Sequence, residues 1–324
     1  MKWGECYGMK QRVEEKKKQD APGNSLGKRV WRYKYIYLMM IPALIFFAIF
    51  SYIPMAGIGI AFREFSFKNP FFGGEFVGLK YFRRLFNSRN FALVMRNTFI
   101  ISFGRLLFEF PMAIGLALLF NEVRGRRTKR FLQTVYSFPH FLSWVVAAGI
   151  LINLLADSGV VNQLIVALGG EKIGFLTMPN LFRPLLYITD NWKEIGWGTI
   201  IYLATIASID SEQYEAAIVD GANRWHQIRY ITLPSLVPII CTMLILQVAN
   251  VMSAGFDQIF NLYNPTVYAT GDIIDTYIYR MTFQLGESFS ASTAFGLFKS
   301  SISVVLLVTA NWIVKRFDKN GGIF

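Results

Sequence analysis

Residues 35–62 read YIYLMMIPALIFFAIFSYIPMAGIGIAF and form a continuous stretch without charge between Lys34 and Arg63. A bilayer core about 30 Å thick is crossed by about 20 mostly apolar residues in a helix. The stretch is therefore long enough to span a membrane with some tilt. It is longer than the apolar region of a signal peptide and follows a long polar tail, so we expect it to stay in the membrane.

Five further stretches have similar length. Residues 131–156 and 231–256 carry no charge. The other three stretches are residues 97–121, one that begins at Pro184 and one that ends at Val314, and they contain Arg105, Glu109, Asp190, Lys193, Glu194 and Lys299. Charge at the bilayer centre costs about 2.5–3.5 kcal/mol per residue, so these three should face a bundle interior or lie at an interface. The sequence thus predicts an all-α membrane protein with six transmembrane helices.

Composition supports this class and indicates the orientation. Hydrophobic residues make up 53% of the 324 residues and charged residues 17%, and 33 Lys+Arg against 21 Asp+Glu give a net charge of +12. Twenty of the 33 basic residues fall in segments that lie inside if the N-terminus is cytoplasmic, and nine fall outside. By the positive-inside rule both termini are predicted to be cytoplasmic, so the excess charge reflects topology and not nucleic-acid binding.

This topology divides the chain into segments. They are a basic cytoplasmic tail (1–34), a transmembrane domain (35–319) with outside loops near 63–93, 157–183 and 257–293 and a cytoplasmic loop at 208–233, and a C-terminal tail (320–324).

The cytoplasmic loop has distinctive local chemistry. Residues 208–234 read SIDSEQYEAAIVDGANRWHQIRYITLP. Asp210 or Ser211 can cap a short helix, and Gly221 can end it in the left-handed conformation. Residues 223–230 can form a second short helix, after which Pro234 opens the fifth span. The loop is therefore predicted to be a helix, a turn and a helix.

The spacing within this loop resembles a known motif. Glu215-Ala216-Ala217, then Gly221, then Ile231-x-Leu233-Pro234 is similar to the EAA motif of permease subunits of binding-protein-dependent ABC importers. The resemblance implies the type I importer permease fold and a coupling helix that contacts a cytoplasmic ATPase dimer. The coupling residues that it implies are Glu215, Ala216, Ala217, Asp220, Gly221, Ile231, Leu233 and Pro234. An ordinary capped loop helix is the alternative.

Other segments resemble one subgroup of that family. Residues 52–57, 78–82, 96–98, 139–144, 192–197 and 255–258 look like permeases that import oligosaccharides, including fragments of acidic plant or algal polysaccharides. A permease subunit of an alginate importer is one candidate. The resemblance implies a second homologous permease subunit, a solute-binding protein, membrane lipid around the chain and a location in the bacterial cytoplasmic (inner) membrane.

Motifs for chemistry are missing from the sequence. The nearest approach to a phosphate loop, residues 73–80, places Leu79 where the phosphate-binding lysine is needed. We therefore predict no catalytic residue, no metal site and no cofactor in this chain, with Mg-ATP bound by partner ATPase subunits. An ion-coupled secondary carrier is the alternative function, and it requires buried coupling carboxylates and often internal repeats. A membrane-embedded enzyme requires a nucleophile, a base and an orienting group.

Amide side chains are the first candidates for the substrate pathway. Gln247 and Asn250 lie in the fifth span, with Asp257 and Gln258 at its outer end. Amides and carboxylates suit sugar hydroxyls, which both donate and accept. Hydrogen bonds between membrane helices use the same residue types, and Asn153 has no stronger claim than such a structural role.

Charged and aromatic residues are further candidates. Arg105 and Glu109 are four residues apart, so they either pair with each other or contact substrate. Lys193 shares a face with Asp190 and Glu194, and we expect this set near the outer interface. Trp192 can stack on a sugar ring or anchor the helix at the membrane surface.

Two outside segments have an expected role. Residues 76–86 predict a basic amphipathic helix, which either docks the solute-binding protein or packs on the membrane surface. Residues 257–294 are too many for a simple connection, and they can close over the cavity or receive the binding protein.

Overall fold

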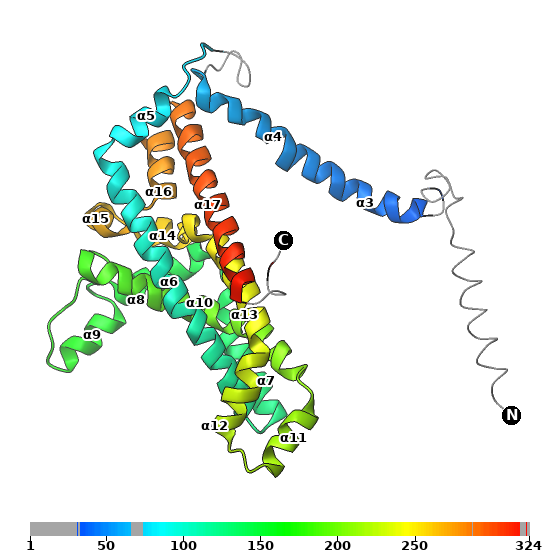
Figure 1. Ribbon diagram of the computed structural model, residues 1–324. Coiled ribbons are helices and arrows are strands. Elements are labelled where there is room, and N and C mark those ends of the chain that lie inside the picture. The colour runs from blue at the N-terminus through cyan, green and yellow to red at the C-terminus, as the bar shows by residue number, and fades with distance from the viewer. Residues whose placement is uncertain (1–30, 32, 66–73, 287, 318–321, 323–324) are drawn as a thin grey trace. The chain divides into compact units, whose positions relative to one another are not determined.

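The computed structural model describes residues 31, 33–65, 74–286, 288–317 and 322. Within these residues the chain is helical, apart from one isolated antiparallel bridge between Arg63 and Phe76. It divides into two units, residues 1–58 and 59–324 (Figure 1). The all-α class is thus confirmed, whereas most of the predicted terminal tails lies outside the described residues.

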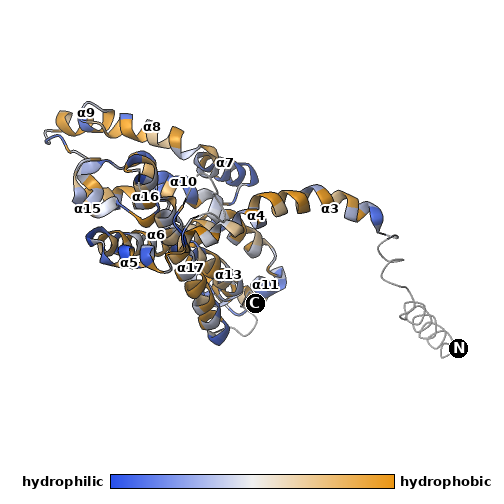
Figure 2. Ribbon diagram, turned by 90° about the horizontal axis from the view of Figure 1, so that it is seen from above, coloured by the Kyte–Doolittle hydropathy of each residue, from blue (hydrophilic) through white to orange (hydrophobic). Residues whose placement is uncertain are grey.

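The first unit contains most of the uncharged stretch at residues 35–62. Its elements are α3 (Lys34–Phe47), the π-helical turn η1 (Ala48–Tyr52) and α4 (Ile53–Met55), and the 3-10 helix η2 (Ala56–Phe62) runs on from residue 56 into the second unit. Pro54 has no N–H to donate to the preceding turn, and the π turn lies directly before it. The segment is strongly hydrophobic, like α8 further along the chain (Figure 2).

Long helices cross the second unit. Five helical segments of the described chain are long and apolar enough to cross a membrane: Lys34–Phe62, Arg89–Glu122, Trp144–Ala167, Arg224–Ala249 and Phe289–Arg316. The corresponding main elements of the second unit are α6 (Arg89–Glu122), α8 (Trp144–Leu155) with α9 (Val160–Ala167), α13 (Leu233–Ala249) and α17 (Phe289–Phe317). α10 (Pro179–Ala207) has 29 residues but carries Asp190, Lys193 and Glu194. The sixth span and the orientation of the termini therefore stay predictions.

The third predicted span is broken in the middle. α7 (Arg126–Ser137) ends where the 3-10 turn η3 (Phe138–Phe141) begins, and α8 starts at Trp144. The Ser143 side chain caps α8 by accepting from the Val146 N–H at 3.3 Å. Pro139 explains the break, because proline disrupts the helical hydrogen bonds of the turn before it.

The second unit is built around α6 and α10, which pack along each other, while α13 packs along α17 (Figure 1). One apolar cluster lies where α6, α10 and α13 meet, around Ala117, Tyr202 and Leu236. A second surrounds Ile101 of α6 and Phe182 of α10. The charged residues of α10 are thus held on a helix at the centre of the unit.

The segment that follows α13 is folded. It contains η5 (Val251–Ser253), α14 (Phe256–Leu262), η6 (Pro265–Val267), α15 (Tyr268–Gly271), α16 (Ile274–Tyr279) and the π turn η7 (Arg280–Gln284). Asn97 of α6 donates to the Ala269 and Asp272 carbonyls at 3.2 and 3.1 Å. Asp272 also pairs with Arg280, and although burial alone lowers the pKa of Arg280, this carboxylate raises it above its ordinary value. The predicted long outside loop is therefore a set of short docked helices.

The basic amphipathic helix expected at 76–86 is present as α5 (Lys80–Asn87). Tyr81 and Leu85 are buried, whereas Lys80, Arg83 and Arg84 are exposed. Figure 2 shows α5 as one of the more hydrophilic helices.

Candidate functional site

The loop between α10 and α13 has the predicted helix, turn and helix. α11 (Ser211–Val219) is capped by Asp210, whose Oδ1 accepts from the Glu212 N–H at 3.0 Å. Gly221 follows with φ of +79°, the left-handed conformation that favours glycine. α12 (Arg224–Gln227) is capped by Asn223, and the π turn η4 (Ile228–Thr232) leads into α13. We call residues 210–232 the EAA loop.

The EAA loop presents apolar side chains without cover in the single chain. Ile218 is 58% exposed, Val219 87%, Trp225 63% and Tyr230 66%. Glu215, Ala216, Asp220 and Gly221 are exposed beside them, and Ala217 is half-buried. Exposed apolar side chains that gather on one loop indicate an interaction surface.

Side-chain contacts join α11 to the turn before α13, and they join the EAA loop to the end of α6. The Tyr214 and Thr232 hydroxyls lie 2.9 Å apart, which links α11 to the turn that opens α13. Arg224 Nε lies 3.8 Å from Glu122 Oε2 at the end of α6. Ile231 and Leu233 are half-buried at the start of α13, and Pro234 lies in its first turn. α11 is thus joined to the start of α13 by a side-chain hydrogen bond as well as by the chain itself.

A buried polar network lies at the other end of α13. Arg105 Nη1 lies 3.2 Å from Asp190 Oδ1, and Arg105 also donates to Gln258 Oε1. Gln258 is fully buried and donates to the Leu186 carbonyl at 2.9 Å and to Thr189 Oγ1 at 2.7 Å. Among the ion pairs of the described residues, the partner of Arg105 is Asp190 and not Glu109. The alternative in which Arg105 and Glu109 pair with each other is therefore wrong. The guanidinium reaches across to α10 and α14, whereas Glu109 faces a cavity.

This cavity, which we call the α6–α13 cavity, has a volume of about 280 Å³. Its lining includes Arg105, Glu109, Gln247 and Asn250, which are four of the predicted pathway residues, together with Ser102 and Ser253. Another predicted pathway residue, Gln258, does not line the cavity but accepts a hydrogen bond from Arg105, which does.

The backbone passes close to Arg105 at the end of η5. Ala254 has φ of +44° and Gly255 has φ of +72°. A Cβ added at Gly255 would lie 1.9 Å from Arg105 Nη1, so a larger residue there would require the guanidinium to move.

A second cavity of about 530 Å³ shares Ser253 and Gly255 with the first. We call it the α14–α16 cavity. Asp257 lines it beside Trp144, Tyr279 and Asp275. Lys299 Nζ lies 2.7 and 2.6 Å from the two carboxylate oxygens of Asp275. The cavity thus combines aromatic rings with carboxylates.

Lys193 has a different role from the one expected. Its ammonium donates to the His140 carbonyl at 3.0 Å and to Glu194 Oε1 at 2.8 Å, while Glu194 Oε2 lies 2.5 Å from His140 Nδ1. The His140 ring stacks on Trp197 with centroids 4.5 Å apart. Asp190 and Lys193 are each only 4% exposed, so their side chains face the interior of the helix bundle, which is one of the two arrangements expected for charge within this span. These residues hold the broken third span against α10.

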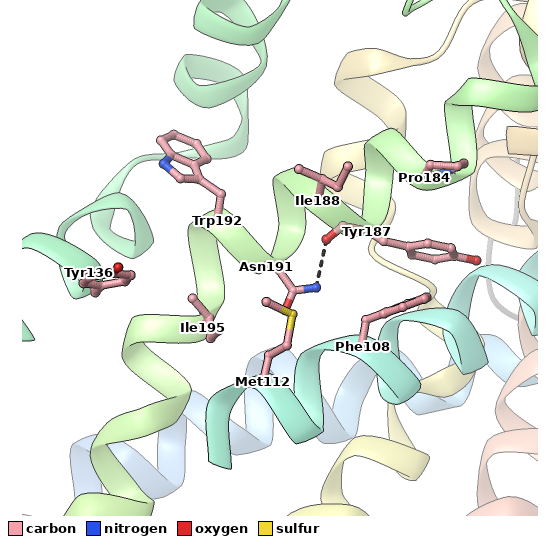
Figure 3. A pocket seen from close by; sticks show the side chains of 9 residues that line it. All are labelled: Phe108, Met112, Tyr136, Pro184, Tyr187, Ile188, Asn191, Trp192 and Ile195. Carbon is pink, nitrogen blue, oxygen red and sulfur yellow. Dashed lines mark hydrogen bonds between the residues drawn. The ribbon is translucent and has the colours of Figure 1, made fainter. Parts of the chain in front are cut away.

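The remaining two candidates lie elsewhere. Asn153 is exposed on α8 and donates to the Gly149 carbonyl of its own helix at 2.8 Å. Trp192 lines a third cavity between α6 and α10 (Figure 3).

Sequence reasoning did not single out several residues of the site. His140, Ser253, Asp275 and Lys299 all take part in it through partners that are distant in sequence. The charge of Lys299 inside an apolar run was the one available signal. Among the described residues, no group of three or more His, Cys, Asp or Glu is placed to hold a metal ion.

The chain thus combines a central helix pair that holds buried charge with a capped helical loop that exposes apolar side chains. The chain belongs to the family of inner membrane components of binding-protein-dependent transport systems, whose model matches residues 109–320.

Individual relatives extend this assignment over most of the chain. Protein LplB of Bacillus subtilis is 43% identical over 312 residues, which cover 94% of this chain and 98% of the relative. The polygalacturonan/rhamnogalacturonan transport system permease protein YteP of Bacillus subtilis is 44% identical over 289 residues, 89% of this chain and 90% of the relative.

A solved structure is similar over the whole fold. It is a bacterial ABC transporter involved in the import of the acidic polysaccharide alginate, and one of its chains is 39% identical with a TM-score of 0.84. The match covers 90% of this chain and 99% of that chain. Another structure of an alginate ABC transporter, in complex with an alginate pentasaccharide-bound periplasmic protein, matches with the same identity and TM-score and covers 92% of this chain and 100% of that chain.

Proposed function

We propose that this chain is one of two permease subunits of an ATP-driven importer and that it moves an oligosaccharide inward by alternating access. The observation that carries this proposal is that α13 links both candidate sites. It begins directly after the EAA loop, and Gln247 and Asn250 near its far end line the α6–α13 cavity. Its 17 residues form an element about 25 Å long. A displacement at the loop therefore reaches the cavity through one helix.

The EAA loop is the proposed binding site for a cytoplasmic ATPase dimer, which binds Mg-ATP. Val219, Trp225 and Tyr230 supply apolar contact area, and Glu215 supplies a polar contact. Work is done on the substrate only if ATP binding favours one of two states that bind the substrate differently. The Tyr214–Thr232 hydrogen bond supports transmission of that bias into α13.

The proposed substrate is an oligosaccharide from an acidic polysaccharide. Sugar hydroxyls need groups that both donate and accept, and the amides of Gln247 and Asn250 do so. Trp144 and Tyr279 offer rings for stacking beside Asp257 in the adjoining cavity. The solved relative, which imports the acidic polysaccharide alginate, supports this substrate class.

The proposed partners outside the membrane follow from the same relatives. The periplasmic protein in the second solved structure supports a solute-binding protein that delivers the sugar. A second, homologous permease subunit would supply the other half of the pathway.

Reconstitution tests the proposal. The chain is purified with its second permease and ATPase, placed in proteoliposomes and supplied with the binding protein and labelled oligosaccharide. Glu215→Ala should leave ATP hydrolysis in place but lower uptake about tenfold, a factor that corresponds to a typical coupling free energy between two sites. Glu212→Ala, on the same exposed helix but outside the motif, should retain uptake.

The opposite result identifies the alternative function. If the chain alone accumulates sugar in response to an ion gradient and without ATP, it is a secondary carrier.

A further inference from the structure

Basic residues are concentrated in one of the segments predicted to lie outside. Residues 63–93 carry six basic residues against two acidic ones, whereas residues 157–183 carry two of each and residues 257–293 one basic residue against four acidic ones. Positive charge is usually kept on the cytoplasmic side of a membrane protein. A cluster of basic residues on the other side therefore needs a separate explanation.

Two cavities lie beside α5, which packs against α6 and α17 (Figure 1). Their volumes are about 540 and 650 Å³, and they share the lining residues Arg84 and Asn87. We call the two cavities together the α5 site. The lining of the first cavity also includes Ser88, Asn90, Tyr277, Arg280 and Leu285. The lining of the second also includes Leu79, Lys80 and Arg83.

The α5 site combines cations with neutral hydrogen-bond donors. The guanidinium groups of Arg84 and Arg280 line the first cavity together with the amides of Asn87 and Asn90. Among the described residues, no carboxylate side chain lines either cavity. Guanidinium, ammonium and amide N–H groups are the donors that hold a phosphate or a carboxylate. The site is therefore complementary to an anion.

Two of the four cations have carboxylate partners outside the cavities. Arg280 pairs with the buried Asp272, and Lys80 Nζ lies 3.6 Å from Glu64 Oε1. The side chains of Lys80 and Glu64 are both more than half exposed, so water weakens this pair. Arg84, which lines both cavities, is exposed as well. Positive charge thus predominates at the site.

Apolar side chains lie next to these cations. Leu285 in the first cavity is 64% exposed, and Leu79 in the second is 56% exposed. Phe86 of α5 is 57% exposed, and its ring centroid lies 5.2 Å from that of Phe298 on α17. Asn90 is the second residue of α6, so the site lies at one end of a membrane-spanning helix. Cations beside exposed apolar side chains at this level suit the headgroup and the upper acyl chains of a lipid.

The α5 site faces away from the proposed sugar pathway. Tyr277 and Met281 line the α5 site, whereas Asp275 and Tyr279 of the same helical segment line the α14–α16 cavity. At about 100° per residue these two pairs lie on opposite sides of the helix. A protein that delivers sugar has to release it on the side of the pathway. This arrangement favours lipid over the solute-binding protein as the occupant.

We propose that the α5 site binds an anionic phospholipid of the outer leaflet. Its phosphate is held by Arg84 and Asn87, and its acyl chains lie along Phe86 and Leu285. The bound lipid keeps α5 against the ends of α6 and α17 at the level of the headgroups. This inference goes beyond the proposed function, because it requires only that the chain lies in a membrane.

Native mass spectrometry of the complete importer, titrated with phosphatidylglycerol, tests the site. Arg84→Gln should lower the affinity for phosphatidylglycerol about threefold to tenfold, the effect of one basic residue near an anionic lipid surface. Binding of phosphatidylcholine, whose headgroup has no net charge, should not change. Arg89→Gln is the matched control, because Arg89 is exposed in the same segment but lines neither cavity. Equal losses in the two variants would overturn the proposal, since they would show diffuse attraction without a defined site.

A competition measurement separates a lipid from a free anion. Inorganic phosphate is added to the complex of the importer with phosphatidylglycerol. The lipid should stay bound, because its acyl chains contribute to binding. Displacement by an equal concentration of phosphate would overturn the assignment to a lipid.

A crosslinking measurement identifies the occupant while Arg84 stays in place, so it does not depend on the folding of the glutamine variant. A photoreactive benzoylphenylalanine replaces Leu285 in the complete importer in cells, and the adducts are identified by mass. Adducts with phospholipid support the proposal. Adducts with the solute-binding protein in place of lipid would overturn it and make the α5 site a protein contact.

Discussion

Arg105 Nη1 lies 3.2 Å from Asp190 Oδ1, so that a cation of α6 and a carboxylate of α10 meet inside the helix pair. The side chains of both residues are largely buried, at 13% and 5% exposure. Gln258 extends the contact to α14. One polar network thus joins α6, α10 and α14 next to the α6–α13 cavity.

Removal of one member of this pair should destabilise the protein more than removal of both. Arg105→Gln leaves the Asp190 carboxylate without its cation, and an uncompensated buried charge costs about 3–5 kcal/mol. The midpoint of thermal unfolding should fall for either single variant and recover in part when Arg105→Gln is combined with Asp190→Asn. Arg127→Gln, on the exposed start of α7, is the control. Losses that simply add in the double variant would show that the two residues do not interact.

Gly221→Ala should weaken coupling through the backbone alone. A Cβ at Gly221 meets no atom within 4 Å, so the cost is that of the left-handed conformation, about 1–2 kcal/mol. Uptake per ATP hydrolysed should fall, and hydrogen exchange in residues 211–227 should rise. Gly149→Ala is a suitable control because its Cβ also meets nothing within 4 Å and its helix is right-handed. Equal effects of both substitutions would show that the left-handed turn at Gly221 has no special role in coupling.

Lys193→Met should destabilise the broken third span. The substitution removes the ammonium that binds the His140 carbonyl and the Glu194 carboxylate, both next to the break. Because Lys193 is buried, we expect a loss of about 3–5 kcal/mol, with part of it restored by Lys193→Arg. Thermal unfolding of the purified importer measures this loss. If the Lys193→Met variant is as stable as the original chain, Lys193 does not stabilise the break in the third span.

Gln247→Ala and Asn250→Ala should weaken transport without affecting the ATPase contact. Each removes an amide from the α6–α13 cavity, and a lost hydrogen bond of ordinary strength raises the KM for the delivered sugar about twofold to tenfold. The KM for ATP should not change. Asn153→Ala, whose side chain bonds only its own helix, should leave both values as they are. An unchanged KM for sugar in both Gln247→Ala and Asn250→Ala would place the pathway elsewhere.

The features that follow from neighbouring residues could be predicted from the sequence. Absence of charge marks residues 35–62 as a membrane segment, and the caps of α11 depend on residues within four positions of one another. The polar network could not be predicted in this way. Arg105 has Glu109 one turn away, yet its partners Asp190 and Gln258 are brought to it by the packing of α6 against α10 and α14. Local spacing carries no information on such contacts.

The break in the third span is an intermediate case. Pro139 was visible in the sequence, but the lack of charge in residues 131–156 is the same for a straight and for a broken helix. The side chains that stabilise the break come from α10, more than fifty residues away.

The exposed side chains of the EAA loop bear on how the cell makes this subunit. Val219, Trp225 and Tyr230 are more than half exposed in the single chain, and such apolar surfaces are what chaperones and proteases bind. A permease subunit produced in excess of its ATPase would present them continuously and be removed. We therefore expect the cellular amount of this subunit to follow the supply of the ATPase, so that the side chains proposed to contact the ATPase also enforce the stoichiometry of the complex.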